Sequence, residues 1–248
     1  MTVNSELDVV RQVLADKPAF HLSGAAHWDA LPGTLAAVRS LVRPGDVTLE
    51  VGAGVSTVIF AACGARHTAV SPDPDEHKLI SEYCESIGVD DSQITFLTGF
   101  SDDVLPKHLS RERTLDVGMV DGGHSFPTPI IDWYYVARAL KVGGRLLIDD
   151  VPIPATIPAF RHMSLDSRWR LDEIFDNRAA TFTLLSEPWL ADDDWVDQPY
   201  NRNYPDYSFA SMTDRMRLTT EHRVHSVKSA LGRRYPALRE FYKSRKAR

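Results

Sequence analysis

From residue 47 onward, short apolar runs alternate with stretches in which apolar residues recur every three or four positions. Short apolar runs bounded by turn residues are typical of buried strands, and the spacing between them is typical of helices packed on a sheet. This alternation predicts a doubly wound, mostly parallel α/β sheet. The predicted strands are Val47–Val51, His67–Ser71, Ile94–Thr98, Leu115–Asp121 and Gly144–Asp149, with helices from Val55 to Cys63 and from Asp75, Ser101 and Pro127.

Two further strand-like runs, Trp169–Phe175 and Ala180–Ser186, end the alternation. Only Asp176–Ala179 lie between them, whereas a parallel crossover needs about a dozen residues or more. The short connection predicts an antiparallel hairpin at one edge of the sheet. We therefore expect a Rossmann-like sheet of seven strands.

The chain is expected to contain three segments: a helical lead-in over residues 1–45, a main domain over 46–186 and an appendage over 187–248. In the lead-in, Leu35 and Val38 illustrate the helical spacing of apolar residues before the turn that precedes the first strand. The regular pattern stops after the predicted hairpin. The appendage is therefore not predicted to add strands to the sheet.

Aromatic residues outside the main domain could contact a ligand. His27 and Trp28 could cover the mouth of a site, but packing against the first helix is the simpler interpretation. Beyond Glu187, acidic and aromatic residues interleave, which is consistent with a lid or with a surface loop anchored by its rings. These residues are Trp189, Asp192, Asp193, Asp194, Trp195, Asp197, Tyr200, Tyr204 and Tyr207.

The formal charge of -6 conceals an asymmetry. Residues 213–248 contain eleven Lys or Arg and three Asp or Glu, a net charge of +8, so residues 1–212 carry -14. The basic end could contact an anionic lipid surface or an acidic partner, although a solvated helix packed on the acidic body is the favoured interpretation. The sequence has neither a secretory signal pattern nor a membrane-spanning apolar run, so we expect a cytoplasmic protein.

A glycine-rich turn follows the first predicted strand, where Gly52 and Gly54 precede Ser56 and Thr57. Glycines at such a junction allow a sharp turn and let a ligand approach the backbone, while the amides of the next helix point toward it. A tight strand-to-helix turn without a ligand remains an alternative.

Carboxylates follow two other predicted strands: Asp121 follows the fourth, and Asp149 and Asp150 follow the fifth. Because the carboxyl ends of parallel strands share one edge, these three groups should converge. Three anionic groups resist burial together unless a cation compensates them, which favours a hard divalent metal. His124 could reach the same site as a base. The alternatives are turn capping by the carboxylates and a backbone-bonded turn histidine.

These motifs resemble a known family. Glu50-Val51-Gly52-Ala53-Gly54 resembles motif I of class I S-adenosylmethionine-dependent methyltransferases, and the strand pattern resembles that fold over residues 47–186. Asp121-Gly122-Gly123-His124, with the later Asp149-Asp150, is similar to the metal-dependent O-methyltransferases, especially those that methylate macrolide sugars. Catechol O-methyltransferase is a more distant relative. The resemblance implies Mg²⁺ or Mn²⁺ on Asp121, Asp149 and Asp150, with His124 taking the substrate proton.

The same resemblance implies a site for S-adenosylmethionine. The family usually carries Glu or Asp at the end of the second strand, where it binds the ribose hydroxyls, but this chain has Ser71 there. Ser71 or Asp73 could make that contact. The implied cofactor residues are Glu50, Gly52, Ala53, Gly54, Ser56, Thr57, Ser71, Asp73, Phe100, Ser101 and Asp121.

We therefore expect a magnesium-dependent O-methyltransferase that acts on a hydroxylated small molecule such as a sugar or diol. Two alternatives are an oxygenase-like relative of the same fold, similar to cephalosporin hydroxylase, and a noncatalytic cofactor-binding protein. We expect a homo-oligomer without a nucleic-acid partner, in which the basic C-terminal segment could contact a membrane surface.

Overall fold

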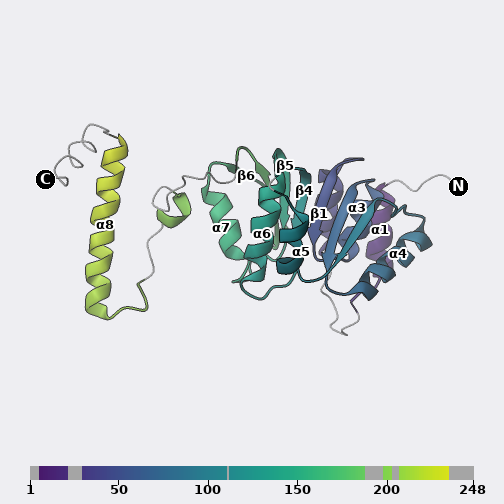
Figure 1. Cartoon of the computed structure of the whole chain (residues 1–248), viewed down its shortest axis with the longest axis horizontal. Helices are drawn as coiled ribbons and strands as arrows, with labels where there is room; N and C mark the ends of the chain where they lie inside the picture. The colour runs from purple at the N-terminus through teal and green to yellow at the C-terminus, as the bar shows by residue number, and fades with distance from the viewer. Residues whose placement is uncertain (1–5, 22–29, 111, 188–197, 203–206, 235–248) are drawn as a thin grey trace. The chain divides into compact units, whose positions relative to one another are not determined.

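A computed structural model describes residues 6–21, 30–110, 112–187, 198–202 and 207–234 (Figure 1). The chain divides into two compact units, residues 1–190 and 191–248. His27 and Trp28 lie outside the described residues, as does most of the acidic and aromatic segment.

The described part of the first unit contains a seven-stranded sheet in the order β3-β2-β1-β4-β5-β7-β6. Strands β1 to β5 run parallel, whereas β7 is antiparallel to both β5 and β6. The predicted doubly wound sheet with a terminal antiparallel hairpin is therefore confirmed. The strands are β1 (Val47–Val51), β2 (Arg66–Ser71), β3 (Ile94–Thr98), β4 (Leu115–Val120), β5 (Leu140–Ile148), β6 (Trp169–Phe175) and β7 (Ala179–Leu184).

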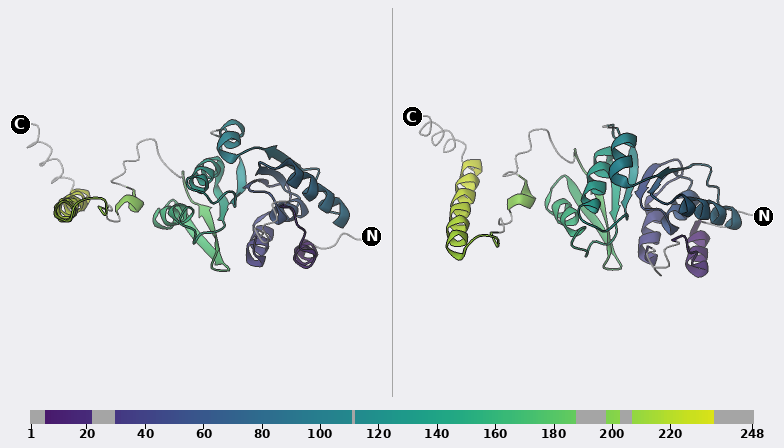
Figure 2. Two further views of the ribbon diagram at one scale, coloured as in Figure 1. Left: turned by 90° about the horizontal axis from the view of Figure 1, so that it is seen from below. Right: turned by 60° about the horizontal axis from the view of Figure 1, so that its bottom comes forward.

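Helices cover both faces of this sheet (Figure 2). The apolar pattern did not predict α7, where prolines interrupt the segment after β5; Pro158 lies in the first turn of that helix, where the missing N–H costs nothing. The helices are α1 (Glu6–Asp16), α2 (Pro32–Leu41), α3 (Val55–Ala62), α4 (Pro74–Ile87), α5 (Ser101–His108), α6 (Thr128–Ala139) and α7 (Ile157–Leu165).

Alternation along the strands divides the core into two layers. Leu49 and Val51 of β1 point to the face covered by α5, α6 and α7, whereas Met119 of β4 and Leu147 of β5 point to the face covered by α1 to α4. Leu49 and Met119 are fully buried. Burial on both faces explains why these strands are continuous apolar runs rather than alternating ones.

Strands β1 and β4 lie side by side although β2 and β3 separate them in the sequence. In a doubly wound sheet, a reversal of strand order of this kind opens a crevice at the carboxyl ends of the strands. The amide of Asp121 donates to the carbonyl of Val51 at 3.0 Å, so the two strand ends are joined directly. This edge of the sheet brings together the glycine turn and the first acidic segment.

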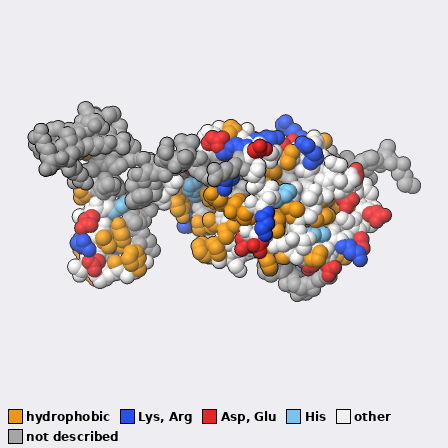
Figure 3. All heavy atoms as spheres, viewed as in Figure 1, with side chains coloured by type: hydrophobic (Ala, Val, Ile, Leu, Met, Phe, Trp, Pro, Cys, Tyr) orange, Lys and Arg blue, Asp and Glu red, His pale blue; other side chains and the backbone are white. Residues whose placement is uncertain are grey.

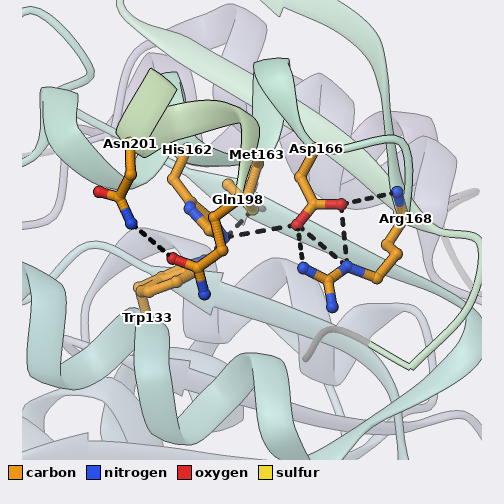
Figure 4. A network of polar contacts seen from close by, with 7 residues as sticks. All are labelled: Trp133, His162, Met163, Asp166, Arg168, Gln198 and Asn201. Carbon is orange, nitrogen blue, oxygen red and sulfur yellow. Dashed lines mark hydrogen bonds and ion pairs between the residues drawn. The ribbon is translucent and has the colours of Figure 1, made fainter. Parts of the chain in front are cut away.

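Polar contacts hold α6 and α7 against the start of β6 (Figure 4). The Trp133 indole N–H donates to Sδ of Met163 at 3.2 Å, and the His162 ring packs edge-on against the Trp133 indole. The Arg168 guanidinium donates to the Asp166 carboxylate, with Nε 2.9 Å from Oδ1. These contacts join α6 to α7 and order the short connection between α7 and β6.

The second unit contains the short helix η1 (Pro199–Arg202) and α8 (Met212–Arg234) within its described residues. The visible face of α8 mixes hydrophobic and charged side chains, and the visible face of the first unit intersperses acidic and basic groups (Figure 3). None of the helices in the described ranges is both long and apolar enough to cross a lipid bilayer.

Helix α6 carries a carboxyl group, Asp132, that has no exposed surface. Burial raises the pKa of Asp132 from 3.8 to about 6, and a hydrogen bond with the Ser101 side chain opposes this shift. The folded protein therefore binds a proton here that the unfolded chain releases at lower pH. The free energy of unfolding should fall as pH rises from about 4 to 6, and should stay lower above that range.

Asp132→Asn removes this titration while keeping the shape of the neutral acid. Relative to wild type, the variant should gain stability between pH 4.5 and pH 7.5, by up to about 3 kcal/mol for a shift of two pKa units. Urea unfolding at both pH values measures the gain, and Asp103→Asn, an exposed change on α5, is the control. An equal difference from wild type at the two pH values would contradict this account.

Candidate active site

A cavity of about 740 Å³ opens at the carboxyl ends of β1, β2 and β4. Its walls include the glycine turn after β1 and the segment from Asp121 to Ser125 after β4. The two sequence motifs therefore share one space. Of the predicted cofactor residues, those lining this cavity are Gly52, Ala53, Gly54, Ser56, Ser71, Phe100, Ser101 and Asp121, whereas Glu50, Thr57 and Asp73 do not line it.

Glu50 lies beneath the glycine turn with 1% of its surface exposed. Its carboxylate accepts hydrogen bonds from the hydroxyls of Ser56, at 2.6 Å, and Thr57. Nε2 of His67 lies 3.0 Å from the same carboxylate, and the His67 ring stacks on Phe60. Glu50 thus braces the first turn of α3 from below. Glu50 therefore supports the glycine turn that lines the cavity but does not itself line it.

The two glycines of the turn serve different needs. Gly52 has φ of +95°, and a Cβ on it would overlap the carbonyl oxygen of Asp121. Gly54 is extended, and a Cβ there would meet only Nε2 of His21, at 3.8 Å. Gly52 is therefore required by the contact between β1 and β4, whereas Gly54 leaves space open for a ligand.

A carboxylate that the sequence analysis did not identify reaches the cavity near the end of β2. Glu76, in the first turn of α4, accepts a hydrogen bond from Ser71 at 2.6 Å and lies 2.7 Å from Nδ1 of His21. Both Glu76 and His21 line the cavity. Asp73 instead caps α4, where it accepts from the amide of Asp75 at 2.9 Å. The sequence signal was the spacing from Ser71, since one helical turn can return an acid to the strand end.

The three predicted metal carboxylates lie near one another but have different environments. Asp149 is buried, and its Oδ1 accepts from the amide of Asp150 at 2.8 Å. Asp121 and Asp150 are each 14% exposed at the side chain. Asp150 has φ of +52°, a backbone conformation that is uncommon for a residue with a side chain. Among the described residues, Asp121, His124 and Asp150 offer ligand atoms within 4.8 Å of one another.

An arginine from the β6–β7 turn lies within the acidic group. Nε of Arg178 is 2.8 Å from Oδ1 of Asp150 and 3.2 Å from Oδ1 of Asp149. Nη2 of Arg178 donates to Oδ2 of Asp150 at 3.2 Å. In the sequence, Arg178 is one of the residues of the Asp176–Ala179 connection, and no local pattern indicates a role for it.

His124 lies on the other side of Asp150, with Nε2 2.9 Å from Oδ2 of Asp150 and 4.0 Å from Oδ1 of Asp121. The hydrogen bond with His124 is the main influence that lowers the pKa of Asp150, with Arg178 acting in the same direction. Burial, followed by the charges of Asp149 and Asp150, raises the pKa of Asp121 well above its usual range. The site therefore favours an ionised Asp150 next to a carboxyl group that retains its proton readily.

A divalent cation fits part of this arrangement. Two carboxylates and an imidazole within 4.8 Å of one another form a suitable donor set. Burial, and then the charges of Asp149 and Asp150, raise the pKa of Asp121, and a cation would offset those charges. Asp121, His124 and Asp150 are the groups that could hold it. Asp149 is directed to Arg178 and to the backbone, so the donor set differs from the predicted one by exchange of Asp149 for His124.

A family described as a methyltransferase domain matches residues 49–151. These residues run from β1 through the glycine turn to the acidic pair after β5. No curated protein sequence matches the chain.

Solved structures share the fold at low sequence identity. Cofactor-bound Rv0187 from MTB is 16% identical, with a TM-score of 0.55, over 74% of this chain and 99% of that one. A protein from Corynebacterium glutamicum is 13% identical, with a TM-score of 0.56, over 75% and 93%. The O-methyltransferase TomG from Streptomyces achromogenes, involved in tomaymycin synthesis and solved with S-adenosylmethionine, is 14% identical, with a TM-score of 0.53, over 75% and 92%.

The sheet order, with its antiparallel β7 between β5 and β6, agrees with these structures in fold. The family match covers the strands that form the cavity. Residues 49–151 thus match a methyltransferase domain family, and the described sheet has the Rossmann-like fold of these solved structures.

Proposed function

We propose that this protein transfers the methyl group of S-adenosylmethionine to a hydroxyl oxygen of a small molecule, such as a sugar or another diol. The observation that carries the proposal is that one cavity is lined both by the glycine turn and by the segment from Asp121 to His124. A donor held at the turn would thus have an acidic group and an imidazole beside its reactive end. The O-methyltransferase TomG, which shares the fold, adds support for oxygen as the acceptor atom.

The reaction is an in-line displacement. A lone pair of the acceptor oxygen forms the new C–O bond, while the electrons of the C–S bond move to sulfur and leave S-adenosylhomocysteine. The hydroxyl proton must leave as this happens, and we assign its removal to His124, which lines the cavity beside Asp121. Asp150, 2.9 Å from Nε2 of His124, orients the ring and stabilises its protonated form.

Asp121, His124 and Asp150 could also hold Mg²⁺ or Mn²⁺. A bound divalent cation lowers the pKa of a hydroxyl that it contacts and thereby favours the nucleophilic form. When Nε2–H of His124 donates to Asp150, Nδ1 is the atom that would take the substrate proton; a cation bound at Nε2 would replace that bond to Asp150, so Nε2 orients the base or binds the metal but not both. Its two roles make different predictions for metal affinity.

Methyl transfer itself is tested with labelled S-adenosylmethionine and a panel of sugars and diols. We expect label in an ether product, with one S-adenosylhomocysteine formed per methyl group. An oxygenase-like activity would instead consume O₂ and leave the label in the donor. Oxygen consumption without methyl transfer would therefore overturn the proposal.

Gly54→Val should lower the affinity for S-adenosylhomocysteine by about tenfold or more, a loss of about 1.4 kcal/mol or more, because the new side chain occupies open cavity. The melting temperature should change little, since Gly54 is extended and nothing crowds its Cβ position. Calorimetry and thermal unfolding measure the two effects. Gly52→Val is the contrast: it should destabilise the fold, because its Cβ overlaps the backbone of Asp121. Full affinity in Gly54→Val would place the cofactor elsewhere.

Glu76→Gln should weaken binding of S-adenosylhomocysteine by about tenfold or more, because a hydrogen bond to a charged group contributes about 1.5–3 kcal/mol. We assign Glu76 to the ribose hydroxyls, since its carboxylate can accept further bonds beside those from Ser71 and His21. The wild type should bind adenosine more tightly than 2′-deoxyadenosine, and Glu76→Gln should lose this preference. Glu82→Gln, on the exposed side of α4, is the matched control. A preserved preference in Glu76→Gln would sink the assignment.

His124→Ala should slow methyl transfer by roughly a hundredfold, the usual scale for loss of a general base. Binding of Mn²⁺, measured without cofactor or acceptor, separates the two roles: it should weaken if His124 is a ligand and stay unchanged if it is only a base. Asp121→Asn should weaken Mn²⁺ binding in either case, and His108→Ala, exposed at the end of α5, is the control. Full turnover in excess chelator would remove the metal from the mechanism, and full turnover in His124→Ala would remove the base.

A further inference from the structure

The acidic group at the ends of β4 and β5 already contains a cation of the chain itself. The Arg178 guanidinium contacts two consecutive carboxylates, with Nε 3.2 Å from Asp149 and 2.8 Å from Asp150. The side chain of Asp149 has no exposed surface, and that of Arg178 is only 24% exposed. A buried carboxylate without a partner is strongly disfavoured, so Arg178 compensates a charge that water does not reach.

Three separate elements fix the position of Arg178. Its amide donates to the carbonyl of Phe175 at 2.9 Å and closes the β6–β7 turn, in which Asp176 and Asn177 have positive φ. Its carbonyl accepts from the amide of Val151, just after the acidic pair, at 2.9 Å. The Asp176 carboxylate accepts from the amide of Gly33 in α2 at 2.8 Å, which anchors the turn from the other side. The guanidinium is thus held in place by backbone as well as by its carboxylates.

The contacts divide the acidic group into two sides. Asp149 is engaged by Arg178 and by the amide of Asp150, and it lies outside the set of close donor atoms. Asp150 belongs to both sides, since Arg178 contacts both of its oxygens and Oδ2 also lies 2.9 Å from Nε2 of His124. If all three carboxylates are ionised, Arg178 reduces their charge from -3 to -2. The remaining charge of -2 is what one divalent cation would neutralise.

We propose that Arg178 is the permanent cation of this site and a positioning residue: it occupies the Asp149 side and thereby limits the cluster to one divalent cation, on the side of Asp121, His124 and Asp150. The inference builds on the metal part of the proposed function. It concerns the chain's own residues and does not depend on which acceptor is methylated.

The test measures Mn²⁺ binding by electron paramagnetic resonance and thermal unfolding with and without Mn²⁺, in the absence of cofactor and acceptor. Arg178→Gln removes the charge, and Arg178→Lys retains it. Arg170→Gln is the matched control, because Arg170 lies in the same hairpin but is 60% exposed and pairs with Asp172. If the loss of any positive charge from the protein strengthens Mn²⁺ binding, Arg178→Gln and Arg170→Gln should change the affinity equally.

Arg178→Gln should melt at a lower temperature than wild type without metal, and its affinity for Mn²⁺ should rise about tenfold or more, because a positive charge no longer opposes the ion. Mn²⁺ should raise its melting temperature more than that of wild type. Arg178→Lys and Arg170→Gln should bind Mn²⁺ within about threefold of wild type, inside the usual scatter of single interactions. A purely structural role would lower stability without tightening metal binding.

The double variant Arg178→Gln/Asp149→Asn keeps the test decisive if Arg178→Gln folds poorly. Removal of the uncompensated carboxylate should restore stability and return the Mn²⁺ affinity toward the wild-type value. Unchanged or weaker Mn²⁺ binding in Arg178→Gln would overturn the proposal. A double variant whose loss of stability equals the sum of the losses in the two single variants would overturn it as well. If wild type binds no Mn²⁺ and Arg178→Gln does, Arg178 opposes the metal altogether, and both the one-ion proposal and the metal part of the proposed function are overturned.

Discussion

Negative charge gathered at the carboxyl ends of β4 and β5 is the constraint that the surrounding structure satisfies. Folding largely buries three carboxylates where these parallel strands end, those of Asp121, Asp149 and Asp150. Carboxylates that lose contact with water require hydrogen-bond donors or cations. Arg178 reaches two of them from a hairpin turn, and His124 reaches Asp150 from the loop after β4. The antiparallel hairpin brings Arg178 to these carboxylates, and the loop after β4 brings His124. Asp150, with its left-handed backbone, lies between the two.

Glu50 provides an instructive comparison within the same edge of the sheet. It is also buried, yet its carboxylate receives Ser56, Thr57 and His67 as partners. A carboxylate with these partners supports the loop and does not line the cavity. Asp121 differs because burial raises its pKa and the charges of Asp149 and Asp150 raise it further. The partners of a buried acid, rather than its burial, separate a structural group from one that can bind a cation or take part in a reaction.

The cofactor end of the cavity follows a related rule. The family resemblance places an acid at the end of β2, and the chain has Ser71 at that position. Glu76 supplies a carboxylate at the same place from the first turn of α4, where it accepts a hydrogen bond from Ser71 itself. A helix that begins directly after a strand brings residues several positions later back to the strand end. A carboxylate can therefore reach this strand end from a different position in the sequence.

The sequence by itself determined the fold class, because the apolar runs of buried strands and the short Asp176–Ala179 connection depend only on local spacing. It also located the glycine turn, Asp121 and the Asp149-Asp150 pair, because the predicted strands define where the strand ends lie. Tertiary structure alone decided that Arg178 lies between Asp149 and Asp150, that Glu76 faces the cavity, and that Gly52 meets Asp121. These contacts join residues of different elements, and the energy of a buried charge depends on every neighbour that folding brings within a few ångströms. The local sequence pattern does not indicate which residues those neighbours are.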